Sequence, residues 1–493
     1  MKKFLIYTSG LLLAISVFLL PHAAHASTYT YYRAITVTST ATVASGTNTN
    51  FPMLVSSTLA SWEASSTGGS ARIQNLCTAP NGSQEPCDLV FATSIANCGV
   101  SNLNFETEKY TSSTGALVDW VQVPSLLAGT VIYACYDAAS VTTDQSHPSS
   151  TWDGNYKGVY HFPNGSSLSV ANSASSTFGS TNHGVTATAG QIDGGSSYDA
   201  STKYIDLANP SVHYDTGVTL EAWINQAAAS SSSETIIEKG YDNGNGKTEV
   251  GLRVGDTINQ GIPQFFTYSA GTHGVVASAQ RLSAATWYHL AGTFDGTNWR
   301  MYINGALTDN VVDSSYFDNT SNWAIGADEA NGIGNIEFWN GTIDEARISN
   351  IARSPSWILT EYNNQANPST FYTVGGEVTV NSGATIGQLD SETLDTGVAL
   401  GAQFNSILWQ GFQQSGSTVQ FQLAVSNASS GPWNYVGSDG TSNTYYTPSA
   451  PGSGVSLSNS IFNNFRYLRY RIFISYVNGT SSRVDDVVVN WSP

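Results

Sequence analysis

The sequence of 493 residues has few charged side chains, and most of them are acidic. Asp, Glu, Lys and Arg together make up 11% of the chain, well below the share in an average globular domain. With 36 acidic and 18 basic residues, the formal net charge is -18. Such a chain repels phosphate backbones, so we expect no nucleic-acid partner. Ser, Thr, Asn and Gly supply the surface polarity instead, as is typical of extracellular β-proteins.

Long apolar runs are also missing after the N-terminus. The run from position 4 to 20 follows two lysines and precedes an A-x-A pattern, which predicts a signal peptide over residues 1–26. The run is short for a membrane span, and no later segment is long and apolar enough to cross a bilayer. We therefore expect cleavage after Ala26 and an extracellular or cell-surface protein without a membrane span. An uncleaved anchor is the alternative.

Cysteine is scarce, and all four cysteines lie in one segment: Cys77, Cys87, Cys98 and Cys135. An even number of cysteines in an exported chain predicts two disulfides. Three pairings are possible, and we favour Cys77–Cys87 with Cys98–Cys135 because the first pair closes a short Pro- and Gly-containing loop. A structural zinc site is the alternative. It is disfavoured because the segment has no C-x-x-C pair and no nearby histidine.

The pattern that is present throughout is that of β-structure. Short runs of Val, Ile, Tyr, Phe and Trp alternate with polar residues, and Asn-Gly and Asp-Gly turns recur. Long amphipathic helices are absent, but one short helix is expected with Ser354 as its N-cap and Pro355 in its first turn. We predict an all-β chain with three tandem β-sandwich or jelly-roll domains after the signal peptide. Their predicted bounds are 27–150, 151–375 and 376–493.

The stretch "WYHLAGTFDGTNWRMYINGALTD", residues 287–309, predicts three consecutive strands. Both faces of the first strand carry apolar bulk, so it is expected inside a stack of sheets, with His289 in the core. Asn304-Gly305 suits a tight hairpin turn because both residues tolerate positive φ. With the closing motif "FWNGTIDEARISNIARS", the stretch resembles the laminin-G-like, concanavalin-A-like jelly roll of bacterial secreted proteins. The resemblance covers roughly residues 151–375.

The two flanking blocks carry resemblances of their own. "LNFETEKYTSSTGALVDWVQVPSLLAGTVIYACYD" and "TWDGNYKGVYHF" are similar to the bacterial domain-of-unknown-function family 2341, which often precedes such a jelly roll. That family has no settled activity, so the resemblance implies architecture alone. The last block, ending in "VDDVVVNW", resembles the accessory β-sandwiches of bacterial surface proteins.

Some concanavalin-A-like proteins are glycosidases of the laminarinase type, which use an E-x-D-x-x-E motif on one strand. No Glu in this sequence is followed two positions later by Asp. Glu234 and Glu238 share a strand face, but an acid at each end of a strand is the simpler interpretation. Motifs of zinc proteases and serine hydrolases are missing as well. We therefore expect no enzymatic activity, with a glycoside hydrolase as the less favoured alternative.

Candidate binding residues lie in and near the loop "DSSYFDNTSNW", where aromatic and polar side chains alternate. The candidates for ligand binding are Tyr316, Phe317, Asn319, Trp323 and Trp339. Packing in the core is the alternative for each aromatic candidate. Asp344 lies on an otherwise apolar strand face and requires a partner. The family resemblance implies that Asp344 helps to hold a structural calcium ion. The alternative is a carboxylate that accepts hydrogen bonds from backbone amides.

These observations predict a secreted or cell-surface binding or adhesion protein. Its jelly roll would bind a carbohydrate or a cell-envelope partner, and the flanking domains would present it. A structural component of a surface layer or fibre, without a small ligand, is the alternative.

Overall fold

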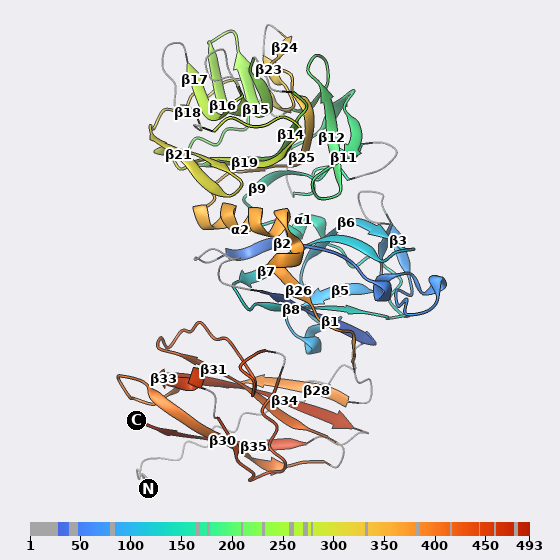
Figure 1. Cartoon of the computed structure of the whole chain (residues 1–493), viewed down its shortest axis with the longest axis vertical. Helices are drawn as coiled ribbons and strands as arrows, with labels where there is room; N and C mark the ends of the chain where they lie inside the picture. Colours follow the sequence, from blue (N-terminus) through green and yellow to red (C-terminus); the bar gives the residue numbers. More distant parts are fainter. Residues whose placement is uncertain are drawn as a thin grey trace. The chain divides into compact units, whose positions relative to one another are not determined.

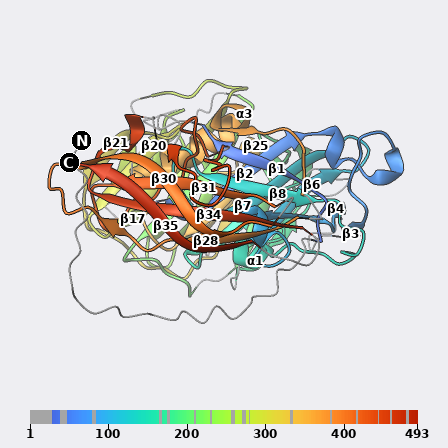
Figure 2. The ribbon, with the colours of Figure 1, turned by 90° about the horizontal axis from the view of Figure 1, so that it is seen from below.

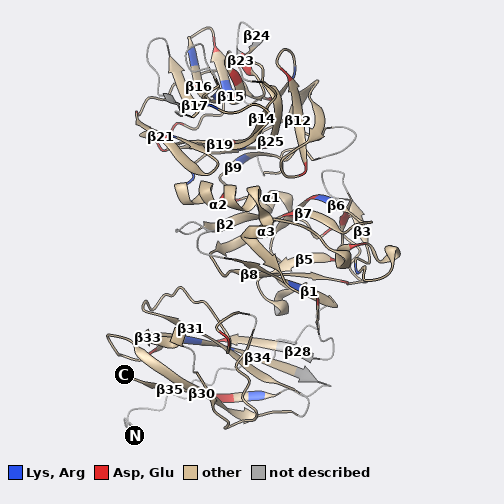
Figure 3. Ribbon diagram, in the orientation of Figure 1, with Lys and Arg blue, Asp and Glu red and all other residues tan. Residues whose placement is uncertain are grey.

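The computed structural model confirms an all-β chain (Figure 1). Charged residues are sparse along the strands (Figure 3). The described residues are 28–38, 48–78, 84–163, 168–174, 178–208, 211–228, 232–255, 261–269, 275–277, 280–330, 334–380, 384–414, 417–442, 444–457, 460–477 and 482–493. The predicted signal peptide lies outside them. Ser27–Val380 form one compact unit, and Asn381–Pro493 belong to another. Among the described residues, no helix is both long and apolar enough to cross a membrane.

The first sandwich consists of two antiparallel sheets that enclose one apolar core. The larger sheet has the order β26–β1–β8–β5, with β27 also on β1. The smaller sheet has the order β2–β7–β6. The strands of this sandwich are β1 (Tyr31–Val37), β2 (Asn48–Thr58), β5 (Leu89–Ala92), β6 (Phe105–Thr111), β7 (Ala116–Leu126), β8 (Val131–Tyr136), β26 (Tyr372–Val374) and β27 (Val378–Thr379). Its short helical segments are η1 (Ala60–Trp62), η2 (Ser65–Thr67), η3 (Ile95–Asn97) and α1 (Pro148–Thr151).

The end of the second predicted domain returns to the first sandwich. α2 (Pro355–Ala366) contacts β2, α3 (Pro368–Phe371) follows, and β26 and β27 pair with β1. The predicted boundary at 375 therefore falls inside a segment that completes the first sheet. The predicted helix is confirmed, because the Ser354 hydroxyl accepts a hydrogen bond from the Trp357 amide and Pro355 opens the helix.

α2 lies between the first sandwich and the jelly roll (Figure 1). On one side, the Asn364 side chain exchanges hydrogen bonds with the backbone of Leu54 on β2. On the other, Gln365 accepts a hydrogen bond of 2.6 Å from the indole of Trp223, and Tyr362 stacks on the same indole. This one helix therefore joins both domains.

The jelly roll packs two antiparallel sheets around a second core. One sheet has the order β10–β13–β22–β15–β16–β17–β18, and the other β11–β12–β25–β14–β19–β20–β21 with β9 on β25. The strands of the first sheet are β10 (Thr181–His183), β13 (Tyr204–Ala208), β15 (Glu234–Asp242), β16 (Lys247–Val254), β17 (Pro263–Ser269), β18 (Val275–Ala277) and β22 (Trp323–Ile325). Those of the second are β9 (Tyr156–Tyr160), β11 (Thr186–Ala189), β12 (Gly194–Asp199), β14 (Val218–Gln226), β19 (Trp287–Phe294), β20 (Asn298–Ile303), β21 (Ala306–Val312) and β25 (Asn340–Ser349). β23 (Asp328–Ala330) and β24 (Gly334–Ile336) form a separate hairpin.

The stretch 287–309 forms consecutive paired strands, as predicted. β19 is internal to its sheet between β14 and β20. Asn304 and Gly305 turn the chain with φ of 50° and 74°, which confirms the predicted positive φ at both positions. Gly305 is also needed for packing, because a Cβ there would lie 2.9 Å from the Leu359 side chain of α2.

Both expected disulfides are present. Cys77 in β3 (Leu76–Thr78) is bonded to Cys87, just after the paired β4 (Gln84–Pro86). Cys98 is bonded to Cys135 on β8, which anchors the segment after η3 to the larger sheet.

The C-terminal unit is a sandwich with its own core. Its long strands are visible in Figure 2. Its strands are β28 (Ala384–Asp390), β29 (Leu394–Asp395), β30 (Ala402–Phe412), β31 (Val419–Ser426), β32 (Val455–Ser456), β33 (Asn463–Phe465), β34 (Tyr467–Val477) and β35 (Arg483–Ser492), with η4 (Ser460–Phe462). β28, β29 and β31 pair with β34, while β32, β33 and β35 pair with β30.

Candidate functional site

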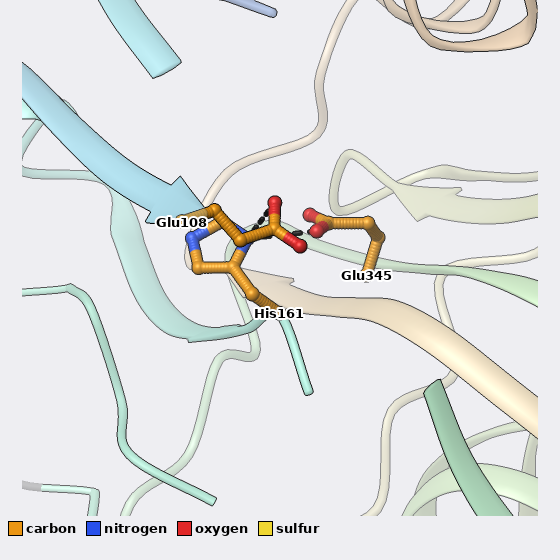
Figure 4. Close-up of side chains that lie close together, drawn as sticks. All are labelled: Glu108, His161 and Glu345. Atoms are coloured by element: carbon orange, nitrogen blue, oxygen red, sulfur yellow. Dashed lines mark hydrogen bonds and ion pairs between the residues drawn. The ribbon is translucent and has the colours of Figure 1, made fainter. Parts of the chain in front are cut away.

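A cluster of buried ionisable side chains lies where the first sandwich meets the jelly roll. We call Glu108, His161 and Glu345 the interface cluster (Figure 4). Glu108 comes from β6 of the sandwich, His161 directly follows β9, and Glu345 lies on β25 of the jelly roll. The three residues thus bring both domains together at one point.

The backbone around the interface cluster is irregular. β25 has a bulge opposite Glu221 and Trp223, and Glu345 at this bulge has a φ of 50°. Phe162, next to His161, also has positive φ, at 54°. Bulges redirect side chains, so the irregularity accounts for an acid that leaves the jelly-roll sheet toward the sandwich.

His161 is the centre of the interface cluster. Its Nδ1 lies 2.7 Å from Glu345 Oε1 and 3.7 Å from Glu108 Oε2. Its Nε2 lies 3.4 Å from Glu106 Oε2. All four side chains are at least nine-tenths buried. Both ring nitrogens therefore face carboxyl groups in a site that water does not reach freely.

Tryptophan side chains close the interface cluster on the sandwich side. The Trp120 indole donates a hydrogen bond of 3.0 Å to Glu108 Oε2, and its ring lies 5.5 Å from the His161 ring in a stacked arrangement. The Trp152 indole donates a bond of 2.8 Å to Glu106. These donors hold the acids in place without adding charge.

Arg347 is the other cation of the network. Its guanidinium donates to Glu345 and Glu361, and both pairs are fully buried. The guanidinium also lies 4.5 Å from the ring centroid of Trp120 and 4.9 Å from that of Trp152. Arg347 thus connects β25, the sandwich tryptophans and α2.

Burial and neighbouring charges shift the pKa values of the interface cluster in different directions. Burial alone would lower the pKa of His161, but the carboxylates of Glu345 and Glu106 outweigh it and raise this pKa well above its usual range. Burial and the charge of Glu345 raise the pKa of Glu108 well above normal. For Glu345, His161 and Arg347 overcome the effect of burial and lower the pKa. The arrangement therefore favours a protonated Glu108 and a charged Glu345.

A second cluster lies at the surface of the jelly roll. We call His213, Glu249 and Asp318 the open cluster. His213 Nδ1 lies 2.7 Å from Glu249 Oε2 and 3.9 Å from Asp318 Oδ1. The Glu249 side chain is fully buried, whereas those of His213 and Asp318 are 31% and 65% exposed. The open cluster therefore has a buried base and an exposed rim.

Part of the predicted binding loop packs onto the open cluster. The Tyr316 hydroxyl donates a 3.0 Å bond to Glu249 Oε1, and the Asn319 amide contacts Oε2 at 3.3 Å. Lys239 Nζ lies 3.8 Å from Glu249, and burial lowers its pKa. Burial raises the pKa of Glu249, although Lys239 and His213 oppose the shift.

The other predicted ligand-binding residues differ in position. Trp323 and Trp339 are completely buried in the jelly-roll core, so the structure gives neither of these predicted ligand-binding residues an exposed surface. Both fill space between the sheets, where an indole contributes apolar contact area. Asn319 is also buried, and its side chain donates to the backbone of Gly240 and Lys247. Phe317 is half-buried on the loop.

Asp344 is fully buried, and its Oδ2 accepts hydrogen bonds from the amides of Gln191 and Ile192 at 2.9 and 3.0 Å. This arrangement is the backbone-amide alternative to calcium binding. Burial raises the pKa of Asp344 well above its usual range. The calcium ion implied by the resemblance stays a prediction.

Sequence reasoning did not identify the interface cluster or the acid of the open cluster. His161 and Glu345 are 184 positions apart, so no local spacing connects them. The available signal was the presence of acidic residues at alternate positions in a strand, as in Glu106 and Glu108 on β6, where both are buried. Buried charges require partners, and such a pattern indicates a contact with another domain.

Comparisons with solved structures give distant likenesses. Domain 4 of an extracellular GH43 arabinanase from Geobacillus stearothermophilus, in complex with arabinotriose, is 18% identical with a TM-score of 0.32; the match covers 42% of this chain and 97% of that one. The binding domain of Paraclostridial Mosquitocidal Protein 1 is 13% identical with a TM-score of 0.35 over 68% of this chain and 75% of that one. A Trypanosoma rangeli sialidase is 14% identical with a TM-score of 0.32 over 43% of this chain and 34% of that one. No curated protein matches the chain.

The family comparison concerns the jelly roll. Residues 199–359 match the model of the concanavalin A-like lectin/glucanases superfamily. The matched segment includes the predicted binding loop, Glu249 and β25. Residues 199–359 therefore form a concanavalin A-like lectin/glucanase domain.

Proposed function

We propose that the protein is an extracellular binding or adhesion protein whose concanavalin A-like domain holds a carbohydrate or cell-envelope partner at the open cluster. The observation that carries the proposal is the open cluster itself. It combines a buried Glu249 with the exposed side chains of His213 and Asp318 on a lectin-type domain. The two disulfides support an oxidising, extracellular location.

The chemistry of the open cluster suits a hydroxylated ligand. The exposed carboxylate accepts hydrogen bonds from sugar hydroxyls, and the imidazole can accept from or donate to them. Half-buried Phe317 offers apolar surface nearby. Glu249 is held by Tyr316, His213 and Lys239, so the base of the site is fixed before a ligand arrives. The net charge of -18 disfavours polyanions, and we propose a neutral glycan.

Binding rather than cleavage is part of the proposal. Glu234 and Glu238 are both buried, where they accept hydrogen bonds from Gln226 and Thr235. Neither is available to a sugar bond at the surface, which supports a non-enzymatic role. Release of reducing ends from β-glucans, lost on mutating a single Glu, would contradict this part of the proposal.

The experiment is a glycan array together with a pull-down on cell-envelope material. We expect the full chain to bind neutral glycans or an envelope component, and the Asp318→Asn and His213→Asn variants to bind at least about tenfold more weakly. Asp309→Asn on β21 is the matched control and should bind as the parent chain does. Blank screens with folded protein, combined with ordered arrays of purified protein, would favour the structural alternative instead.

The flanking modules belong to the same proposal. We propose that the first sandwich is a domain of the unknown-function family 2341 and that the C-terminal sandwich is an accessory module, both serving to present the lectin-type domain. Export through the signal peptide is tested by sequencing the N-terminus of the mature protein. A start at Ser27 supports export, and retention of residues 1–26 contradicts it.

Calcium binding at Asp344 is a separate part of the proposal and can be tested on its own. If Asp344 is a ligand, calcium at a hundredfold excess over its Kd stabilises the fold by about 2.7 kcal/mol. The measurement is the melting temperature in calcium and in chelator. Equal values would leave Asp344 with its two amide donors alone.

A further inference from the structure

The interface cluster contains the donor set of a metal site. His161 Nδ1 and one oxygen each from Glu108 and Glu345 lie within 4.8 Å of one another. The three groups come from separate segments of both domains, and all are buried. Donor atoms arranged around one point in this way match the first requirement for binding a cation.

The charges of the network do not balance. Four carboxyl groups contact His161 or Arg347: those of Glu106, Glu108, Glu345 and Glu361. These acids face two cationic side chains, which leaves an excess of two negative charges if all are ionised. A charge excess is costly away from water and must be neutralised by protons or by a cation. A divalent cation bound to His161 Nδ1 requires the neutral imidazole, so together with Arg347 it offsets three of the four carboxylate charges.

A buried oxygen without a hydrogen-bond partner also supports a bound cation. Within the described residues, Glu108 Oε1 is buried and makes no hydrogen bond. The neighbouring Trp120 and Trp152 indoles already donate to the other oxygens of the network. The buried carboxylate oxygen thus lacks a partner of the kind that a cation provides.

The donor types select the class of cation. One imidazole nitrogen with two carboxylates suits a divalent transition-metal cation such as zinc, whereas calcium requires six to eight oxygen ligands. We propose that Glu108, His161 and Glu345 bind a divalent transition-metal cation, with zinc as the first choice, which ties the first sandwich to the jelly roll. This site is independent of the open cluster and of the proposed ligand.

The test uses the full chain, stripped with chelator, refolded with or without zinc, and analysed for bound metal by mass spectrometry. We expect one zinc per chain and a higher melting temperature with zinc. His161→Asn and Glu345→Gln should weaken binding by at least about tenfold, while His213→Asn should bind as the parent does. Absence of bound zinc, or loss of zinc in His213→Asn instead of His161→Asn, would overturn the proposal.

Glu108→Gln keeps the proposal testable if the other variants fail to fold. The Gln side chain has the same shape and still accepts the Trp120 hydrogen bond, so the metal-free variant should melt at or above the temperature of the metal-free parent. We expect it to lose the increase in melting temperature that zinc gives the parent. An unchanged zinc-dependent increase in Glu108→Gln would rule out Glu108 as a ligand and overturn the proposed donor set.

Discussion

The interface cluster and the open cluster contain one histidine and two acids each, but they differ in exposure. In the interface cluster, all three side chains are at least nine-tenths buried, between two domains. In the open cluster, Glu249 alone is buried, and His213 and Asp318 face solvent. The same two kinds of group, imidazole and carboxylate, therefore have different tasks. Buried charges must satisfy one another, whereas exposed ones remain available for a ligand because water screens them.

Removing a buried cation should give the largest difference in the free energy of unfolding between a buried and an exposed site. Arg347→Met leaves Glu345 and Glu361 without their guanidinium, and we expect the free energy of unfolding to fall by about 3–5 kcal/mol. Arg300→Met, which removes a partly exposed ion pair with Asp295, should cost about 0–1 kcal/mol. The measurement is urea unfolding of both variants. Equal losses would contradict the role of burial.

The two histidines provide a direct comparison. His161→Asn removes an imidazole from buried acids, so we expect a loss of about 2–3 kcal/mol in the free energy of unfolding. His213→Asn should cost less than about 1 kcal/mol, because His213 is 31% exposed and the buried Glu249 keeps its hydrogen bonds from Tyr316 and Asn319. Thermal and urea unfolding of both variants would measure the difference. A loss at His213 as large as that at His161 would be inconsistent with this interpretation.

The burial of an acid in the jelly roll also predicts that the stability of the fold depends on pH. Burial raises the pKa of Asp328 to about 7 from its ordinary value of 3.8, while its Oδ1 accepts a hydrogen bond from the Tyr241 amide. Between these pH values the folded state holds a proton that the unfolded state has released. Stability is thus complete below the unfolded pKa and falls as pH rises toward 7, by about 2 kcal/mol between pH 5 and pH 7.

Asp328→Asn tests this prediction, because an amide can still accept the Tyr241 hydrogen bond but does not titrate. We expect melting temperatures measured from pH 4 to pH 8 to change less in this variant than in the parent. Asp309→Asn serves as the control and should keep the parent's slope. Parallel curves for Asp328→Asn and the parent would remove Asp328 as the cause.

The smallest effect is expected at the rim of the open cluster. Asp318→Asn should change the free energy of unfolding by less than about 0.5 kcal/mol, since the side chain is 65% exposed. Its effect should appear in ligand binding instead. A large loss of stability would mean that Asp318 is a structural residue, and other exposed residues would have to bind the proposed ligand.

Much of the fold could be predicted from local patterns. Alternation identified the strands within 287–309, and Asn304-Gly305 identified the turn because positive φ restricts the choice of residues. Ser354 and Pro355 likewise predicted the start of α2. Each of these features depends on residues that are close together in the sequence.

The site was less predictable because it depends on distant contacts. Trp323 and Trp339 were candidates for ligand binding because they lie at or near loops in the sequence, but both are buried. An aromatic residue at a strand end has the same sequence signature whether it faces the core or the solvent. Tyr316 does reach the open cluster, yet its partner Glu249 lies 67 positions away. The bulge at Glu345 turns this acid toward the first sandwich and shifts the alternation of β25 by one residue, because Ile343, Ala346 and Ile348 all lie in the jelly-roll core.

The return of β26 and β27 to β1 has a consequence for how the chain is made. The jelly roll is inserted into the first sandwich, whose larger sheet is complete only after Thr379 has been synthesised. Until then, β1 has an open edge on that side, a surface prone to pairing with other chains. The jelly roll has its own core and can fold before β26 and β27 have been synthesised and paired with β1. Fragments that stop at 150 or at 367 should therefore aggregate, and the smallest soluble piece that contains the first sandwich should extend to Val380.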